Sequence, residues 1–129
     1  MLSPTNISGQ LAGNWSPTYG TYTITGNVTV PIGTVLSIEP STNIVVNNGS
    51  KIEVKGKIEA LGSERGLINF STDNTWKGVM IIDSQEDNVI DLCYFTGCTE
   101  SAVYIDNSTV DVLIALFMRI RTPIKKVLQ

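Results

Sequence analysis

The sequence predicts an all-β solenoid, a fold in which each turn of chain contributes several short strands and stacks on the next turn. Between Val35 and Ala60, apolar residues recur at every second position in short bursts, and charged residues fill the alternate positions of the last two bursts. One buried side and one solvated side at period two are typical of half-buried strands. Turn residues at Pro40, 47–50 and Gly56 separate the bursts, so the strands are too short for an ordinary open sheet.

This alternation predicts the direction of individual side chains. Lys51, Glu53, Lys55 and Glu59 are expected to point outward into solvent. The residues expected to point inward are Leu36, Ile38, Ile44, Val46, Ile52, Val54, Ile58, Ile68, Phe70, Val79, Ile81, Val103 and Ile105.

The segments that flank this stretch complete the predicted organisation. Residues 1–22 are rich in Ser, Thr, Gly and Pro with isolated aromatic residues, and they predict an irregular N-terminal cap that covers the open end of the solenoid. Residues 23–112 predict the coils themselves. Weak internal repeats align Phe70 with Phe95, and Ile82 with Ile105, at spacings of 25 and 23 residues that fit one coil.

Four runs of the chain carry a family resemblance: YTITGNVTVPIGTVLSIEPSTNIVV, KIEVKGKIEALGS, LINFST and WKGVMI. They resemble the first coils of right-handed parallel β-helix repeat proteins, the pectin-lyase-like scaffolds common in bacterial surface and secreted proteins. The resemblance covers residues 19–112 and implies a right-handed parallel β-helix of a few coils. One departure is Ser41, because a glycine usually follows the proline of this turn in the family.

Residues 113–129 do not follow the alternation of apolar and polar residues: they contain the continuous apolar run LIALFMRI and end in a segment rich in Lys and Arg. Three interpretations of this atypical tail stay open: a helix that caps the open end, a frameshifted or prematurely ended gene, and a disordered tail. A membrane span is excluded for this run, because its eight residues cannot cross a bilayer core that requires about 20.

The composition limits the chemistry. The chain has 129 residues and a net charge of −3 without a basic stripe before its last dozen residues, so nucleic acid is not an expected partner. The absence of histidine excludes Ser-His-Asp and Cys-His nucleophile systems and disfavours the common zinc sites. Two interpretations of the cysteines stay open: Cys93 as a small buried strand residue, or a disulfide between Cys93 and Cys98.

Few residues are candidates for a site, and no catalytic or cofactor-binding residue is predicted. Pectate-lyase-type catalysis on the family fold resembles a Ca²⁺-aided β-elimination with clustered acids and an arginine base. Asp83 and Asp106 fall at matching repeat positions and are weak candidates for a Ca²⁺ site, although Asp before Ser or Asn is also a usual turn residue. Arg65, the only arginine among the predicted coils, lies in a turn where solvent exposure explains it.

Three aromatic residues, Trp76, Tyr94 and Tyr104, are candidates for glycan contact. The alternative interpretation is that aromatic residues pack in the core or, as for Trp76, across a coil corner. A stacking surface for sugars needs rings that are exposed on one face, which the sequence does not establish.

These observations predict a structural or binding scaffold: the first coils of a larger extracellular or cell-surface β-helix protein, with a role in adhesion or glycan contact. No signal peptide is visible at Met1–Pro4. The expected partners are further coils of a parent protein, a second copy of the chain, or a polysaccharide. The competing interpretation is the N-terminal part of a polysaccharide lyase or hydrolase whose catalytic coils are missing.

Overall fold

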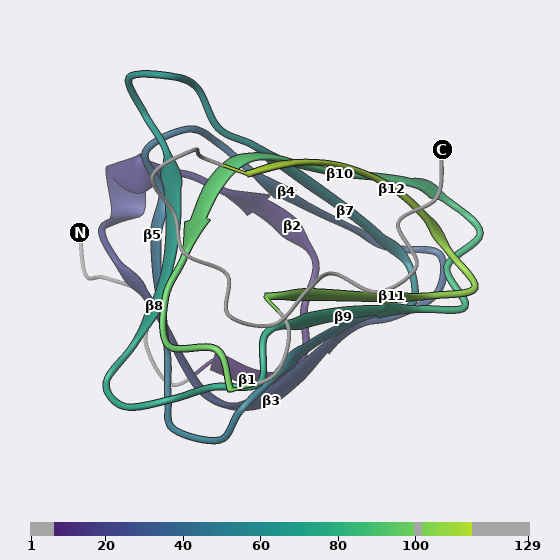
Figure 1. The fold of residues 1–129 in the computed structure, drawn as a ribbon, viewed down its shortest axis with the longest axis horizontal. Coiled ribbons are helices and arrows are strands. Elements are labelled where there is room, and N and C mark those ends of the chain that lie inside the picture. Colours follow the sequence, from purple (N-terminus) through teal and green to yellow (C-terminus); the bar gives the residue numbers. More distant parts are fainter. Residues whose placement is uncertain (1–6, 100–101, 115–129) are drawn as a thin grey trace.

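In a computed structural model of the chain, the described residues, 7–99 and 102–114, form a β-solenoid of about 4 turns (Figure 1). Every strand pair in this part of the chain is parallel. The elements are β1 (Ile7–Gln10), β2 (Gly13–Trp15), the 3-10 helix η1 (Pro17–Tyr19), β3 (Tyr22–Val30), β4 (Val35–Ile38), β5 (Asn43–Val46), β6 (Ile52–Val54), β7 (Lys57–Leu61), β8 (Ile68–Thr72), β9 (Val79–Ile82), β10 (Asp87–Phe95), β11 (Val103–Asp106) and β12 (Thr109–Ile114).

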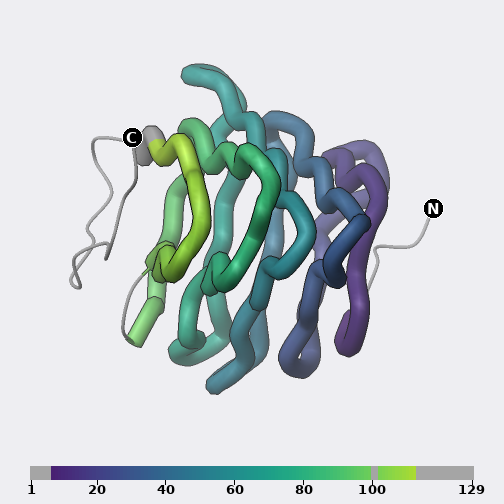
Figure 2. The backbone as a smooth tube through the Cα atoms, turned by 90° about the vertical axis from the view of Figure 1, so that its right-hand side faces the viewer, coloured from purple at the N-terminus to yellow at the C-terminus, as the bar shows by residue number. Residues whose placement is uncertain are grey.

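The solenoid has three faces, named here by their position in Figure 1. The upper face holds β2, β4, β7, the first half of β10 and β12. The left face holds the start of β3, then β5, β8 and the second half of β10. The lower face holds β1, the end of β3, β6, β9 and β11. The chain runs from upper to left to lower face as it approaches the viewer, which makes the coil right-handed, and Figure 2 shows the turns stacked side by side.

The core consists of apolar ladders in which each turn places its inward side chain on that of the previous turn. On the left face, Tyr22, Ile44, Phe70 and Phe95 form one such ladder. All thirteen side chains predicted to point inward are buried, and the four charged residues predicted to point outward are exposed or half-buried. This burial pattern confirms the predicted alternation. The pattern is fixed because a strand with one buried face cannot shift by one residue without exposing its whole apolar set.

The register between the last two turns corrects one expectation. Phe70 pairs with Phe95 as expected, but Ile105 pairs with Ile81, and Asp106 pairs with Ile82. The predicted alignment of Ile82 with Ile105 is therefore wrong by one residue. Ile81 has no exposed surface and points into the core, whereas Ile82 is half-buried at the end of β9, where the next corner begins.

Corners between faces require backbone conformations that extended strands do not supply. Among the residues that the structure describes, four non-glycine residues have positive φ: Ser41 (68°), Asp83 (54°), Leu92 (52°) and Asn107 (49°). Ser41 thus occupies the left-handed region at the position where the family resemblance predicts glycine, and the turn keeps the glycine-like conformation with a serine in it.

The two ends of the predicted coils differ in detail from expectation. Residues 7–15, expected to be irregular, contain β1 and β2, which pair with β3 and β4. Trp15 lies on this first turn and stacks on Tyr22 with ring centroids 4.5 Å apart. At the other end, β12 continues through Ile114, two residues beyond the predicted limit. The remainder of the predicted tail, 115–129, lies outside the described residues.

Candidate functional site

Asp83 and Asp106 do not form a pair of stacked carboxylates. The residue that stands beside Asp83 in the next turn is Asn107, 24 positions later, and its Nδ2 donates to Asp83 Oδ1 at 2.9 Å. The backbone N–H of Asp83 donates to the carbonyl of Asp106 at 3.0 Å. Both Asp83 and Asn107 are left-handed corner residues, so their side chains stabilise the corner. Within residues 7–99 and 102–114, no group of three or more His, Cys, Asp or Glu side chains lies close enough to hold a metal ion.

Trp76 is a core residue. Its side chain has no exposed surface, and its ring stacks with Phe70 and Phe95 at centroid distances of 6.0 and 6.3 Å. The indole Nε1 donates to the carbonyl of Thr96 at 2.7 Å, which satisfies the only polar atom of the ring. A glycan cannot reach a fully buried ring, so the expectation of a glycan contact at Trp76 is wrong and the alternative of internal packing is confirmed.

Tyr94 and Tyr104 are both half-buried and lie in the last described turn, but on different faces. Tyr94 belongs to β10 and pairs with Asn69 on the left face, whereas Tyr104 belongs to β11 and pairs with Met80 on the lower face. The structure does not bring the two rings together into one stacking surface. Each remains a candidate contact on its own face.

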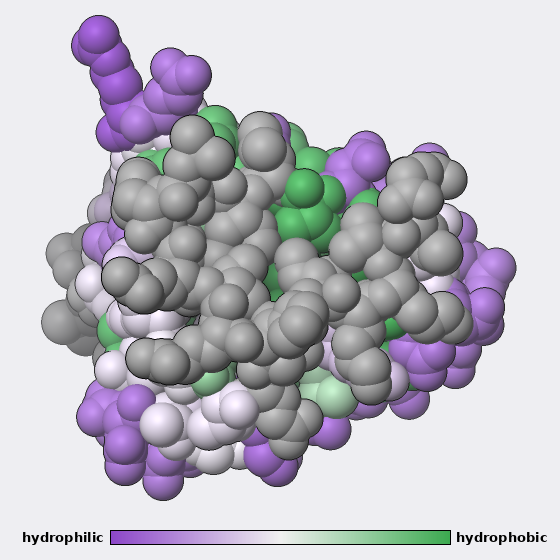
Figure 3. Space-filling view, in the orientation of Figure 1, coloured by the Kyte–Doolittle hydropathy of each residue, from purple (hydrophilic) through white to green (hydrophobic). Residues whose placement is uncertain are grey.

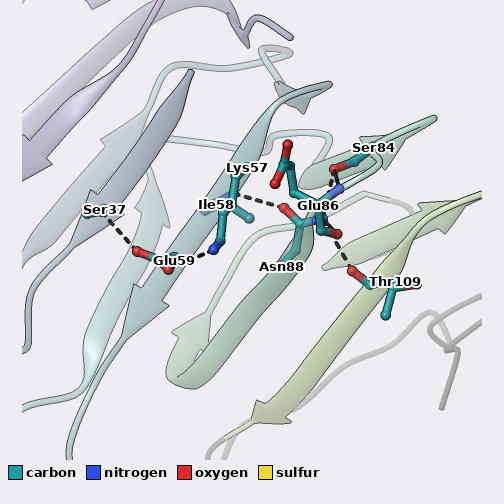
Figure 4. A network of polar contacts seen from close by, with 8 residues as sticks. All are labelled: Ser37, Lys57, Ile58, Glu59, Ser84, Glu86, Asn88 and Thr109. Atoms are coloured by element: carbon teal, nitrogen blue, oxygen red, sulfur yellow. Dashed lines mark hydrogen bonds and ion pairs between the residues drawn. The ribbon is translucent and has the colours of Figure 1, made fainter. Parts of the chain in front are cut away.

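The most extensive polar network of the described residues centres on Asn88, which the sequence analysis did not identify (Figure 4). Asn88 stands at an inward position of β10, on the same ladder as Val110, and is 1% exposed. Its Oδ1 accepts from the N–H of Ile58 at 2.9 Å. Its Nδ2 donates to Ser84 Oγ at 2.9 Å and to the carbonyl of Thr109 at 3.2 Å. The side chain therefore bonds to the turns on both sides of its own.

Ser84 extends this network. Its hydroxyl donates to the carbonyl of Gly56 at 2.6 Å, and its N–H donates to Ser108 Oγ at 2.9 Å. Because both ends of the Asn88 amide and the Ser84 hydroxyl are used within the chain, this network serves the backbone of the corner and leaves no group for chemistry. The alternation of Asn88 with Ile90 around the outward Val89 is the one sequence signal that predicts its inward position.

An open polar depression of about 220 Å³ lies beside this network, between the corners 84–87 and 107–109, and Ser84 and Ser108 belong to both. Figure 3 shows that hydrophilic residues gather at the corners of the cross-section. Glu86 and Asp87 line the depression with exposed carboxylates, and no cysteine or arginine is among its lining residues. Arg65, the one coil arginine, is exposed in the turn between β7 and β8.

The cysteines do not supply a nucleophile either. Cys93 and Cys98 are not bonded to each other, so the structure contains no disulfide between them. Burial, together with the charge of Asp91, raises the pKa of the Cys93 thiol to about 12. Burial alone raises the pKa of the Cys98 thiol to about 12. Both thiols are therefore protonated at neutral pH, whereas a catalytic cysteine requires the thiolate.

The outward side of the left face differs from those of the other two faces in its charge. The upper face carries Glu59, which pairs with Lys57 at 3.1 Å, and the lower face carries Glu53. The paired outward columns of the left face contain no charged residue; they are Thr23, Val45 and Ser71, and Asn43, Asn69 and Tyr94. We call these six residues the uncharged left face. Charged residues lie at the corners that border this face, such as the exposed Asp73 after β8.

Comparisons with other proteins add no assignment: no protein-family model, no curated protein and no solved structure matches the chain. The likeness to pectin-lyase-like proteins therefore rests on the quoted sequence runs alone, and the fold rests on the structure. The part of the chain that the structure describes contains no helix with the length and apolar character needed to span a membrane.

Proposed function

We propose that the chain is a structural scaffold: a stiff β-solenoid that belongs to a larger extracellular or cell-surface protein and offers its faces for adhesion or glycan contact. The observation that supports this best is the continuity of the inward ladders through all described turns, with side chains such as Ile44 and Ile81 fully buried. Stacked turns joined by parallel ladders move little relative to one another, because each turn is hydrogen-bonded to its neighbours along its length.

The chemistry of the described side chains supports a role without catalysis. The Asp83 carboxylate and the Ser84 hydroxyl are used to hold corners, and the Cys93 thiol is protonated at neutral pH. A lyase or hydrolase of the related type needs several acids that converge on one groove. The two acids of the corner depression, Glu86 and Asp87, are consecutive in one turn of the chain, so they do not converge on a groove from different strands.

Amide hydrogen exchange on the purified chain tests this proposal. We expect slow exchange with similar protection in β5, β8 and β9, because these central strands open only with the whole stack. In parallel, polygalacturonate incubated with the chain and Ca²⁺ should keep its length and release no unsaturated uronides. Fast exchange in one central turn would contradict a stiff scaffold, and release of unsaturated uronides would favour the competing lyase interpretation.

A further inference from the structure

We infer that the uncharged left face binds a neutral polysaccharide along the solenoid, with Tyr94 as its stacking residue. This inference rests on the proposed scaffold function and names the partner and the face. Three observations carry it: the absence of charge from the two outward columns, the hydrogen-bonding groups that one of them offers, and the half-buried aromatic ring at its end.

The first observation concerns charge. A face with Glu, Asp or Lys keeps these groups hydrated, and covering them with a neutral polymer carries a desolvation cost that no partner charge repays. On the left face this cost is absent, since its outward residues are Thr, Ser, Asn, Val and Tyr. An anionic polymer such as polygalacturonate finds no cation there. The charge of the face therefore matches an uncharged polymer.

The second observation is the Asn43–Asn69 column. Asn69 Nδ2 donates to Asn43 Oδ1 at 3.0 Å and to the carbonyl of Leu67 at 3.4 Å. Among the described residues, the Asn43 amide nitrogen and the Asn69 amide oxygen make no hydrogen bond within the chain. The face thus presents a donor and an acceptor on neighbouring turns. A sugar hydroxyl both donates and accepts, so it satisfies both groups.

The third observation is Tyr94, which continues this column on the next turn. Its ring is half-buried, packs against the core on one side, and has a hydroxyl at its far end. Aromatic rings with an apolar face and a polar tip are suited to contact the apolar side of a sugar ring. Because successive turns are stacked about 4.8 Å apart, the column extends along the solenoid axis and presents an extended site for a linear polymer.

Binding is measured by retention of the full chain on insoluble cellulose and xylan and by affinity electrophoresis in dextran gels, with polygalacturonate as the anionic polymer. We expect retention on at least one neutral polymer that added salt does not weaken, because no charge pair contributes. Tyr94→Ala should lower the affinity about tenfold, the loss expected for one ring contact. Asn43→Asp, which places a carboxylate on the uncharged left face, should lower it by a similar factor.

Tyr104→Ala is the matched control, since Tyr104 is also a half-buried outward tyrosine of the last turn but lies on the lower face. It should bind as the parent chain does, and circular dichroism melts of all variants identify any loss that is due to unfolding. No retention on any neutral polymer, equal losses in the two tyrosine variants, or binding that salt abolishes would each overturn the inference. A chain that fails here but shows uniform exchange protection and no polysaccharide cleavage leaves the scaffold proposal intact, so the two failures are distinguishable.

Discussion

Asn88 allows a stringent test of how the turns are held together. Replacement by alanine removes the Oδ1 acceptor of the buried Ile58 N–H and the donor to the Thr109 carbonyl. A buried N–H left without a partner costs about 1–3 kcal/mol, and each further lost hydrogen bond costs about 1 kcal/mol. We therefore expect Asn88→Ala to lower the free energy of unfolding by about 3 kcal/mol. For a chain of this size that corresponds to a fall in Tm of about 12 °C.

Urea unfolding followed by circular dichroism measures this change, with an unchanged m-value showing that the native state remains compact. Asn69→Ala is the control, because the Asn69 side chain also hydrogen-bonds to a residue one turn away, Asn43, but from an outward position. That variant should lose less than about 1 kcal/mol, the range for a solvated surface contact. If Asn88→Ala costs no more than Asn69→Ala, the buried amide does not bridge the turns and the reasoning from its burial is refuted.

Three further perturbations follow from the corners and the thiols. Gly56→Ala should lower the free energy of unfolding by about 3 kcal/mol or more, because the added methyl group clashes with two backbone carbonyls of the preceding turn. Gly26→Ala is the control and should be nearly neutral, because its methyl group would meet only one side-chain atom, at 3.4 Å. Equal unfolding free energies of the two variants would contradict this reasoning. Ser41→Gly should raise the unfolding free energy by about 0.5 kcal/mol, since relief of the left-handed strain exceeds the added chain entropy, and a decrease would argue against strain at this corner. Because burial raises the pKa of both thiols from 9.0 to about 12, the unfolded chain loses these protons first, and stability should decline as pH rises through this window by up to about 1.4 kcal/mol per unit per thiol. Urea titrations from pH 8 to pH 11 should show a flatter decline for the double variant Cys93→Ala/Cys98→Ala, and an identical decline would mean that other groups cause it.

The sequence by itself determined which side chains point inward and that the strands stack as a solenoid. This information is local: alternation at period two and turn residues after every few positions fix the buried side of each strand, whatever the strand later pairs with. The burial of Ile38, Val54 and Ile68 is already contained in their immediate neighbours. For the same reason the outward direction of Lys55 and Glu59 was predictable.

Only the tertiary structure decided which residues of different turns meet. The stacking partner of a residue depends on the length and backbone conformation of every corner between the two, and β9 and β11 pair 24 residues apart, one more than the 23 of the sequence alignment. This explains why the expected pairing of Asp83 with Asp106 gave way to Asp83 with Asn107. The burial of Trp76 and the bridging role of Asn88 were hidden for the same physical reason, because both depend on contacts with residues of neighbouring turns that lie 20 to 30 positions away in the chain.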